Sequence, residues 1–435
     1  MNDYKLVKNT EWKHVEINGE NKEIPKNWKK VSVSELVLSK GDLKKGPFGS
    51  SITKNMFVNN GIKVYEQKNA IKKDFNLGNS YITKEKFKEL SGFIVEPGDF
   101  IMSCAGTIGE LYLLPPEAPT GVINQALIKM KICKEIIHYS YFKFLFSFDN
   151  FKKGFSSDGG IIVNFNLDTL RKVECILPIL EKQSAIADIL SSQESIIQDI
   201  ESLISKYESR FQYLSEELLS GRLRVKELDG QLILYKNAED NWKEVEINGE
   251  MKQIPMDWNI SKVSDIFEVQ RGKVLSKDYI QVNRGIYPVY SSATENNGSI
   301  GNINSYMFDG EYLTWTTDGV YAGTVFYRKG KFNCTNICGV LKDKTQNSLK
   351  GLFYFIKSEL PKHVNHIGNS KLMSNTVSDI LFIYPETKEQ FRVAKLLTQQ
   401  EDLINQQKEF LTKEKQKFDW LLDNLLSGKY LVQDQ

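Results

Sequence analysis

The strongest constraint on the fold is an internal repeat that frames two unlike stretches of sequence. The segment WKHVEINGE at 12–20 returns as WKEVEINGE at 242–250, an offset of 230 residues. A second pair of motifs, PxxxxQxxxAxxL at 178–190 and LLSG at 218–221, returns at 385–397 and 425–428, an offset of 207 residues. The motifs at the start and at the end of the first half match those of the second half, although the two offsets differ. Each half therefore consists of a repeated frame around an insert that differs between the halves.

Composition limits the class of protein. At 435 residues, with 41% hydrophobic and 26% charged residues, the chain predicts two to four globular domains. No apolar run reaches the roughly 18 residues of a membrane span, and no secretion signal follows Met1. Five cysteines, an odd number, are typical of reduced thiols. We expect a cytoplasmic protein without membrane contact.

The second motif of each half begins and ends a long amphipathic helix. Apolar residues recur there in alternating steps of four and three, which is a coiled-coil seam. Each helix of roughly 38 residues would be about 57 Å long. The seam needs a partner, and we expect the two helices to pack antiparallel. The seam residues are Ile186, Leu190, Gln193, Ile197, Ile200, Ile204, Phe211 and Leu214 in the first helix, and Val393, Leu397, Gln400, Ile404, Leu411, Phe418 and Leu421 in the second.

Two seam positions are polar in both copies. A buried amide at Gln193 or Gln400 would fix the register of the helix pair at some cost in stability. Alternatively, both side chains lie at a solvated edge of the pair. The sequence does not decide between these two readings.

The inserts are more basic than the frame. Residues 29–177 contain 21 Lys and Arg against 15 Asp and Glu, and residues 259–384 contain 14 against 10, which gives net charges of +6 and +4. The whole chain is only +2, so the remainder carries −8. This distribution favours phosphate-facing modules on a spacer that avoids DNA.

The inserts also share a texture of short strands between glycines, which predicts a mixed α/β domain in each. Segment 61–65 resembles 285–290, and 105–107 resembles 322–324. The expected fold is therefore mixed α/β, with two globular domains separated by two long antiparallel coiled-coil helices. The expected domains are 1–178 and 222–385, and the expected helical segments are 179–221 and 386–435.

On the duplicated Pro-Gln-Ala-Leu and Leu-Leu-Ser-Gly motifs and the heptad helices, the whole chain resembles the specificity subunit of a type I restriction–modification system. The resemblance implies that each recognition domain reads one half of a bipartite double-stranded DNA site and that the helical pair sets the gap. It also implies two methyltransferase subunits and restriction/translocase subunits as partners. S-adenosylmethionine, ATP and Mg would belong to those partners, so this chain would bind no cofactor or metal and catalyse nothing itself.

Base reading needs Arg, Lys, Asn or Gln at base edges, and phosphate contacts come from Lys, Ser, Thr and backbone amides. Loops that carry these types are candidates for DNA contact. The candidates are Lys44, Lys45, Ser50, Ser51, Gln67, Lys68, Asn69, Ser156 and Ser157 in the first insert, and Arg271, Lys273, Ser291, Ser292, Thr316, Thr317, Asn369 and Lys371 in the second.

Two other functions stay open at this point. A coiled-coil adaptor without a nucleic-acid role would show the same frame. A Mg-dependent nuclease is the weaker alternative, because only Glu66 and Lys68 form an acid-x-Lys pair and 291–293 in the second insert lacks both charges. The chain has no GxxxxGK[ST] phosphate loop, and Cys334 and Cys338 lack metal-ligand spacing to any histidine pair.

Overall fold

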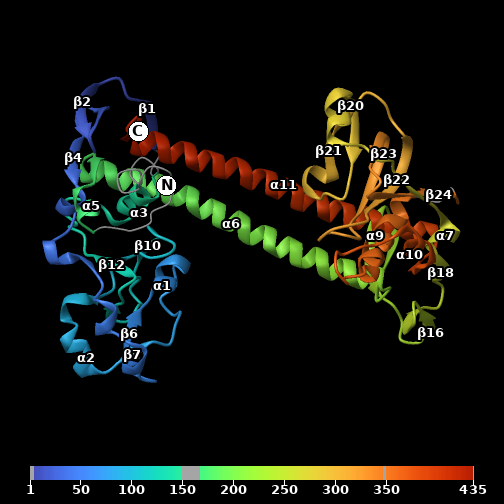
Figure 1. The fold of residues 1–435 in the computed structure, drawn as a ribbon, viewed down its shortest axis with the longest axis horizontal. Coiled ribbons are helices and arrows are strands. Elements are labelled where there is room, and N and C mark those ends of the chain that lie inside the picture. The colour runs from blue at the N-terminus through green and yellow to red at the C-terminus, as the bar shows by residue number, and fades with distance from the viewer. Residues whose placement is uncertain (1–3, 149–166, 346–348, 435) are drawn as a thin grey trace. The chain divides into compact units, whose positions relative to one another are not determined.

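The computed structural model describes residues 4–148, 167–345 and 349–434 (Figure 1). The chain divides into two compact units, which we call unit 1 (residues 1–201 with 410–435) and unit 2 (residues 202–409). Helix α6 (Leu180–Leu219) begins in unit 1 and ends in unit 2, and helix α11 (Thr387–Leu426) runs the opposite way along the chain. Within the described residues, no helix combines the length and apolar character that a bilayer crossing requires.

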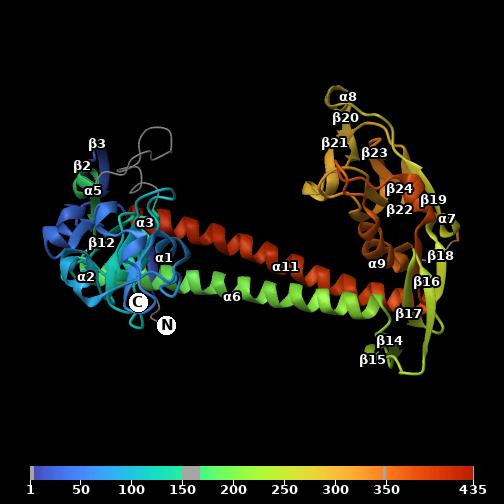
Figure 2. The same ribbon diagram turned by 60° about the horizontal axis from the view of Figure 1, so that its bottom comes forward.

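The two long helices lie against one another in antiparallel orientation within each unit, as predicted (Figures 1 and 2). Lys415 pairs with Glu201 at 2.7 Å in unit 1, and Lys408 pairs with Glu208 at 2.6 Å in unit 2. All the predicted seam residues are buried or half-buried. The coiled-coil prediction is therefore confirmed, and each helix has 40 residues.

One of the two seam glutamines is the buried amide that the sequence allowed. Gln193 is buried and its Nε2 donates to the Glu414 carboxylate across the helix pair at 2.5 Å. Gln400 is only half-buried. Its repeat-related partner position, 207, holds a tyrosine rather than a carboxylate, so the polar contact belongs to unit 1.

Unit 1 contains two four-stranded sheets, with orders β10-β9-β12-β5 and β7-β6-β11-β8. Helix α3 packs its Tyr141, Phe142 and Phe144 into the main core, to which the helix pair contributes Leu190 and Leu425. The strands are β1 (Tyr4–Lys8), β2 (Trp12–Ile17), β3 (Glu20–Pro25), β4 (Lys29–Ser32), β5 (Leu43–Lys45), β6 (Ile62–Tyr65), β7 (Tyr81–Ile82), β8 (Ile94–Val95), β9 (Phe100–Ser103), β10 (Leu111–Leu113), β11 (Gly121–Ile123), β12 (Leu127–Met130), β13 (Glu174–Leu177) and β26 (Tyr430–Asp434), and the short helices are α1 (Gln67–Lys72), α2 (Lys84–Glu89), α3 (Tyr139–Ser147) and α5 (Leu167–Lys172).

Unit 2 contains one six-stranded sheet of order β19-β24-β22-β23-β20-β21. Helix α9 packs Leu352 and Phe355 against Trp258 and against the N-terminal part of α11. The strands are β14 (Leu223–Leu228), β15 (Gln231–Lys236), β16 (Trp242–Ile247), β17 (Glu250–Pro255), β18 (Asn259–Lys262), β19 (Phe267–Arg271), β20 (Arg284–Tyr290), β21 (Ser299–Ile303), β22 (Phe308–Thr316), β23 (Val325–Cys334), β24 (Cys338–Asp343) and β25 (Leu381–Tyr384), and the short helices are α7 (Val263–Ile266), α8 (Lys277–Val282), α9 (Leu349–Glu359) and α10 (Ser374–Asp379).

The repeated motifs make the same contacts in both units. Gln183 donates to the carbonyl oxygen of Pro178 at 2.9 Å, and Gln390 donates to that of Pro385 at the same distance. A Cβ on the Gly of either LLSG motif would lie 2.2–2.3 Å from a ring carbon of the Pro that precedes the buried Trp28 or Trp258. These motifs therefore close each end of the helix pair onto the β2–β3 hairpin or its copy.

The ends of the chain complete the repeat. Strand β1 pairs antiparallel with β26, and the equivalent pair in unit 2 is the β14–β15 hairpin. The amide of Asn9 donates to Lys429 O at 2.9 Å, and that of Asn237 donates to Arg222 O at 3.0 Å. The strand pair is therefore the same in both units, but a turn joins its strands in unit 2, whereas in unit 1 they come from opposite ends of the described chain.

A buried ion cluster breaks this equivalence. Arg224 is 5% exposed and donates to both carboxylate oxygens of Glu389 at 2.6–2.7 Å and to those of Asp257 at 2.8–3.1 Å. At the repeat offsets of 207 and 230, unit 1 has Leu431, Lys182 and Asn27 instead. The two ends of the frame therefore share their shape and differ in their buried charge.

Candidate nucleic-acid interface

In unit 2 the four predicted loops come together at one end of the sheet. The Ser292 hydroxyl accepts hydrogen bonds from the backbone amides of Thr317 and Asp318 at 3.2–3.3 Å. The amide of Gly319 donates to Ser370 O at 3.0 Å, which attaches the 369–371 loop. The amide of Lys273 donates to Cys334 O at 3.0 Å, which attaches the 271–273 loop through the turn after β23.

In unit 1 two predicted loops meet in the same way, through segments that were not predicted. Gln67 reaches the carbonyl oxygens of Ala105 and Thr107, and so joins α1 to the loop after β9. The amide of Gly46 donates to Leu127 O at 2.8 Å, which joins the 44–51 loop to the turn between β11 and β12. The third predicted loop, with Ser156 and Ser157, lies outside the described residues.

The two loop clusters are built on the same backbone hydrogen bonds. Five amide-to-carbonyl bonds in unit 1 have a counterpart in unit 2 at the matching strand positions, and all ten are 2.8–3.2 Å long. The pairs are Asn124→Tyr65 with Thr335→Tyr290, Leu127→Asn124 with Cys338→Thr335, Cys104→Ala126 with Thr317→Ile337, Gly46→Leu127 with Gly272→Cys338, and Gly109→Ser103 with Gly323→Thr316.

This match confirms the shared insert fold and corrects one detail of the sequence alignment. Tyr65 and Tyr290 are equivalent, as the 61–65 and 285–290 resemblance predicted. The predicted match of 105–107 with 322–324 is wrong, because Gly323 forms the bond that Gly109 forms. The loop in unit 2 is longer by one residue between its anchor strand and that glycine, so short identical tripeptides fell out of register.

Gly46 and Gly272 occupy one structural position and leave no room for a side chain. A Cβ at Gly46 would lie 1.8 Å from Asn124 O, and one at Gly272 would lie 2.0 Å from Cys334 O. The cationic residues beside them, Lys45 and Arg271, pair with equivalent positions on β12 and β24 and are exposed. In each cluster an exposed cation therefore directly precedes the glycine that contacts the turn.

All six predicted cations in the described residues are exposed or half-buried. The exposed candidates in the described residues are Lys45, Ser50, Lys68, Arg271, Lys273, Asn369 and Lys371. The half-buried candidates are Lys44, Ser51, Gln67 and Ser292. Four of these cations already have an internal partner. Lys44 lies 4.3 Å from the Phe93 ring centroid, and Lys68 pairs with Glu66 at 2.7 Å. Arg271 Nε donates to the Ser374 hydroxyl at 3.0 Å, and Lys371 Nζ lies 4.0 Å from an Asp318 carboxylate oxygen.

Four predicted contact residues are instead supports beneath the surface. Asn69 is fully buried, and its amide group caps α1 and donates to the carbonyl oxygens of Asp74 and Leu77. The other three, Ser291, Thr316 and Thr317, are also buried and bond within the cluster. Their burial differs from the exposure that polar loop residues were expected to have, and contact of these four residues with DNA stays a prediction.

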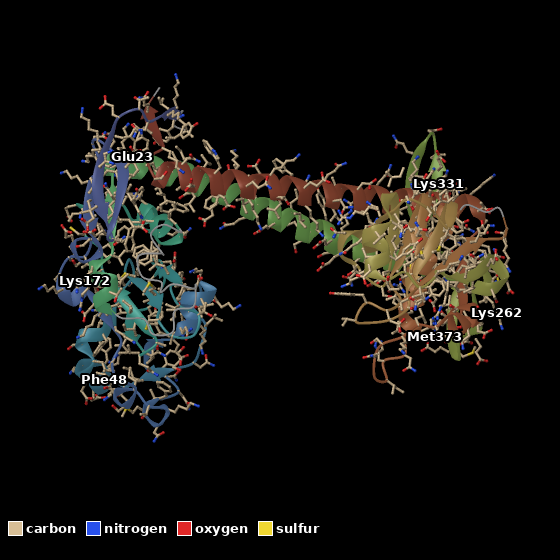
Figure 3. The ribbon with its side chains drawn as sticks, turned by 45° about the horizontal axis from the view of Figure 1, so that its top comes forward. Glu23, Phe48, Lys172, Lys262, Lys331 and Met373 are labelled. Carbon is tan, nitrogen blue, oxygen red and sulfur yellow. The ribbon has the colours of Figure 1, made fainter. Side chains whose placement is uncertain are left out.

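Sequence reasoning also missed exposed apolar residues on the same loops. Phe48 on the loop after Gly46 is 87% exposed, and Val320 and Ile367 on the unit 2 loops are 88% and 89% exposed. Figure 3 shows Phe48 far from Glu23 within unit 1, and Met373, which follows the 369–371 loop, on the opposite side of unit 2 from Lys331. The sequence contained a signal for them, namely large apolar side chains inside glycine-rich loops. In protein–DNA complexes such side chains contact thymine methyl groups or wedge between bases.

Buried side chains support the unit 2 loop cluster from beneath. The Arg328 guanidinium lies 3.6 Å from the centre of the Tyr290 ring, and its Nε donates to the Thr314 hydroxyl at 3.1 Å. Burial lowers the pKa of Arg328. In unit 1, burial raises the pKa of the Cys104 thiol, so the group beside the Gln67 contact is neutral rather than an anion facing the cations.

The described residues give little support to metal chemistry. They contain no group of three or more His, Cys, Asp or Glu side chains arranged to hold a metal ion. Glu66 is engaged by Lys68 and by the Ser80 hydroxyl, and its equivalent in unit 2 is Ser291. Cys334 and Cys338 are buried with their sulfurs 3.4 Å apart, while His363 bonds Glu359.

Comparisons with known proteins agree with the duplicated architecture. The family model described as the type I restriction modification DNA specificity domain matches residues 25–206 and again 255–413. A Mycoplasma pneumoniae protein named as a type I specificity subunit is 36% identical over 248 residues, which cover 56% of this chain and 81% of that protein. The specificity subunit of a type I restriction enzyme from the same organism is 44% identical over 146 residues, 33% of this chain and 44% of that protein. The chain spans about half the length (47%) of a third such protein, at 41% identity over 171 residues.

Two solved structures share the fold. The S subunit of a type I restriction–modification system from M. genitalium has a TM-score of 0.56 at 15% identity, covering 92% of this chain and 96% of that chain. A chain from a structure of the type I system that concerns complex assembly and conformational transition has a TM-score of 0.55 at 12% identity, covering 93% and 99%. At these identities the likeness concerns the fold alone.

Proposed function

The chain belongs to the type I restriction–modification DNA specificity family, and we propose on that basis that each unit reads one half of a two-part DNA sequence. The loop clusters around Gly46 and Gly272 are the reading surfaces. The α6–α11 pair sets the number of base pairs between the halves.

The observation that carries this proposal is one backbone frame built twice with different side chains on it. The shared bonds fix the loop backbone, while equivalent exposed positions differ, such as Lys45 and Arg271. Such a design suits recognition, because phosphate contacts and loop backbone set the docking and the variable side chains distinguish base edges. A chain that only joined other proteins would have no need for cations and apolar groups gathered on matching loops of both units.

The same proposal assigns catalysis to partner proteins. Two methyltransferase subunits dock on the frame, one for each half, and restriction/translocase subunits join them. S-adenosylmethionine, ATP and Mg are bound by those subunits, and this chain acts in the cytoplasm without a cofactor of its own. The duplicated frame supports two docking positions, since Gln183 and Gln390 and the two LLSG glycines make the same contacts at both ends.

Binding of duplex DNA by the full chain tests the proposal. A pool of duplexes with a randomised centre is selected on the purified chain, and a two-part motif with a fixed gap is the expected result. Binding to random duplex should weaken steeply between 50 and 200 mM salt, because each neutralised phosphate releases counterions. Absence of binding at low salt would favour the adaptor alternative. Cutting that requires Mg and disappears in Glu66→Ala would favour the nuclease alternative.

A further inference from the structure

We propose that Gln125 and Asn336 are the paired amide readers of the two units, each of which recognises an adenine edge in its own half-site. This inference rests on the proposed function and names residues within it. Neither residue stands out in the sequence. They become related only through the hydrogen bonds that make the two loop clusters equivalent.

The two side chains stand at one position of one turn. In unit 1 the amide of Leu127 donates to Asn124 O at 3.2 Å, and in unit 2 the amide of Cys338 donates to Thr335 O at 3.0 Å. Each bond closes a four-residue β-turn whose second residue is Gln125 or Asn336. Both of these residues are exposed, although the residues on either side of the turn belong to the buried strands β11, β12, β23 and β24.

The turns are held rigidly from several directions. Ahead of the turn, the amides of Asn124 and Thr335 donate to Tyr65 O and Tyr290 O. The residue after each amide reader accepts a bond from Cys104 or Thr317 at 2.9–3.2 Å. A side chain on such a turn loses little backbone freedom on binding, which is the requirement for discriminating one base from another.

A cation and a bare backbone lie beside each amide. Gly46 and Gly272 touch the turn so closely that a Cβ would overlap its carbonyl oxygens. Lys45 and Arg271 directly precede these glycines and are exposed. A duplex strand that passes each glycine would place a phosphate near the cation and a base edge near the amide.

The chemistry of the amide specifies the base. A side-chain amide offers one donor and one acceptor in a plane, which matches the N6 amino group and N7 of adenine in the major groove. Guanine presents two acceptors there and suits an Arg or Lys instead. Because both units present an amide at the same position although most of their exposed loop residues differ, we assign both amides to adenine.

The experiment is selection from a randomised duplex pool on the full chain and on single variants. Gln125→Ala should abolish the preference for one adenine in one half of the motif and leave the other half unchanged. Asn336→Ala should do the reciprocal. Discrimination at the affected base pair should fall roughly 10- to 100-fold, the range expected for one bidentate contact. Gln125→Glu should turn the preference toward cytosine, whose N4 donates to a carboxylate.

Matched controls are exposed asparagines at the far ends of the equivalent strands. Asn60 precedes β6 and Asn304 is bonded through its backbone near the start of β20, away from both turns. Asn60→Ala and Asn304→Ala should select the wild-type motif.

The outcomes separate this inference from the proposed function. If the wild-type chain selects a two-part motif and Gln125→Ala and Asn336→Ala select the same motif, the amide assignment is overturned and the function stands. A uniform loss of affinity for all duplexes, or loss of a preference for a base other than adenine, also overturns the assignment. If the wild-type chain selects no motif, both the function and the assignment are rejected.

Discussion

Replacing Arg224 by alanine should destabilise unit 2 by about 3–5 kcal/mol, the cost of leaving a buried charge without its partner. The magnitude follows from Glu389, which is 4% exposed and receives two of the hydrogen bonds of Arg224. Asp257 adds little, because 53% of its side chain is exposed and water can replace the lost guanidinium. A loss of this size is a large share of the 5–15 kcal/mol by which native domains are stable.

Urea unfolding of the full chain measures the effect, and Arg222→Ala provides the control. Arg222 is two residues away and pairs with Glu217 at 2.8 Å, with 54% of its side chain exposed. Such a surface pair contributes about 0–1 kcal/mol. A rescue variant, Arg224→Leu with Glu389→Leu, should recover stability to within about 1 kcal/mol of the wild type, since apolar groups often replace a buried ion pair without loss.

Two results would refute this reasoning. Arg224→Ala could lose no more free energy of unfolding than Arg222→Ala, which would mean that water replaces the guanidinium beside Glu389. The double leucine variant could lose as much as Arg224→Ala, which would mean that the ion cluster supplies net stability. Unit 1 argues against the second result, because it closes the same joint with Leu431 in the position of Arg224.

The remaining predictions concern pH, the turns and the helix pair. The hydrogen bond from Arg224 lowers the pKa of Asp257. The stability that Asp257 contributes is therefore complete above the unfolded pKa of about 3.9 and is lost as the pH falls through the lower folded value. That part of the difference in unfolding free energy between wild type and Arg224→Ala should shrink below about pH 4. Gly272→Ala should weaken selection of one half-site, because its Cβ would meet Cys334 O, whereas Gly49→Ala, which has open space, should not. Gln193→Leu with Gln400→Leu should keep the fold and broaden the accepted gap between half-sites; an unchanged gap in the selected motif would argue against a register role. Seven residues inserted into both α6 and α11 should add about 10 Å of helix and lengthen the gap by about 3 base pairs, whereas an unchanged gap would argue against the helices as the spacer.

The frame was predictable because its contacts are made by side chains. The heptad seam and the antiparallel pair both follow from repeated residue types at fixed spacing. The ion cluster of Arg224 was not predictable in this way. It involves three segments that the sequence separates by up to 165 residues, and its repeat-related positions hold unlike residues.

The loop clusters were only partly predictable. The sequence named the unit 2 loops as candidates, and the structure joins them, since Ser292 bonds Thr317 and Gly319 bonds Ser370. The exposure of individual side chains was not legible, and Asn69 and Thr317 proved to be buried. A polar residue in a turn can bond the backbone as easily as it can face solvent, and local sequence does not distinguish these cases.

The contrast between frame and loop clusters explains why one repeat is obvious and the other hidden. In the frame, Trp28, Gln183 and their copies make contacts with their side chains, so the residue types must recur. In the clusters the corresponding contacts run from backbone amide to backbone carbonyl, which any residue other than proline can supply, except where Gly46 and Gly272 leave no space. The geometry of the second repeat therefore persists while its exposed side chains change. A scaffold with that property can alter what each loop cluster recognises without altering how the cluster is built.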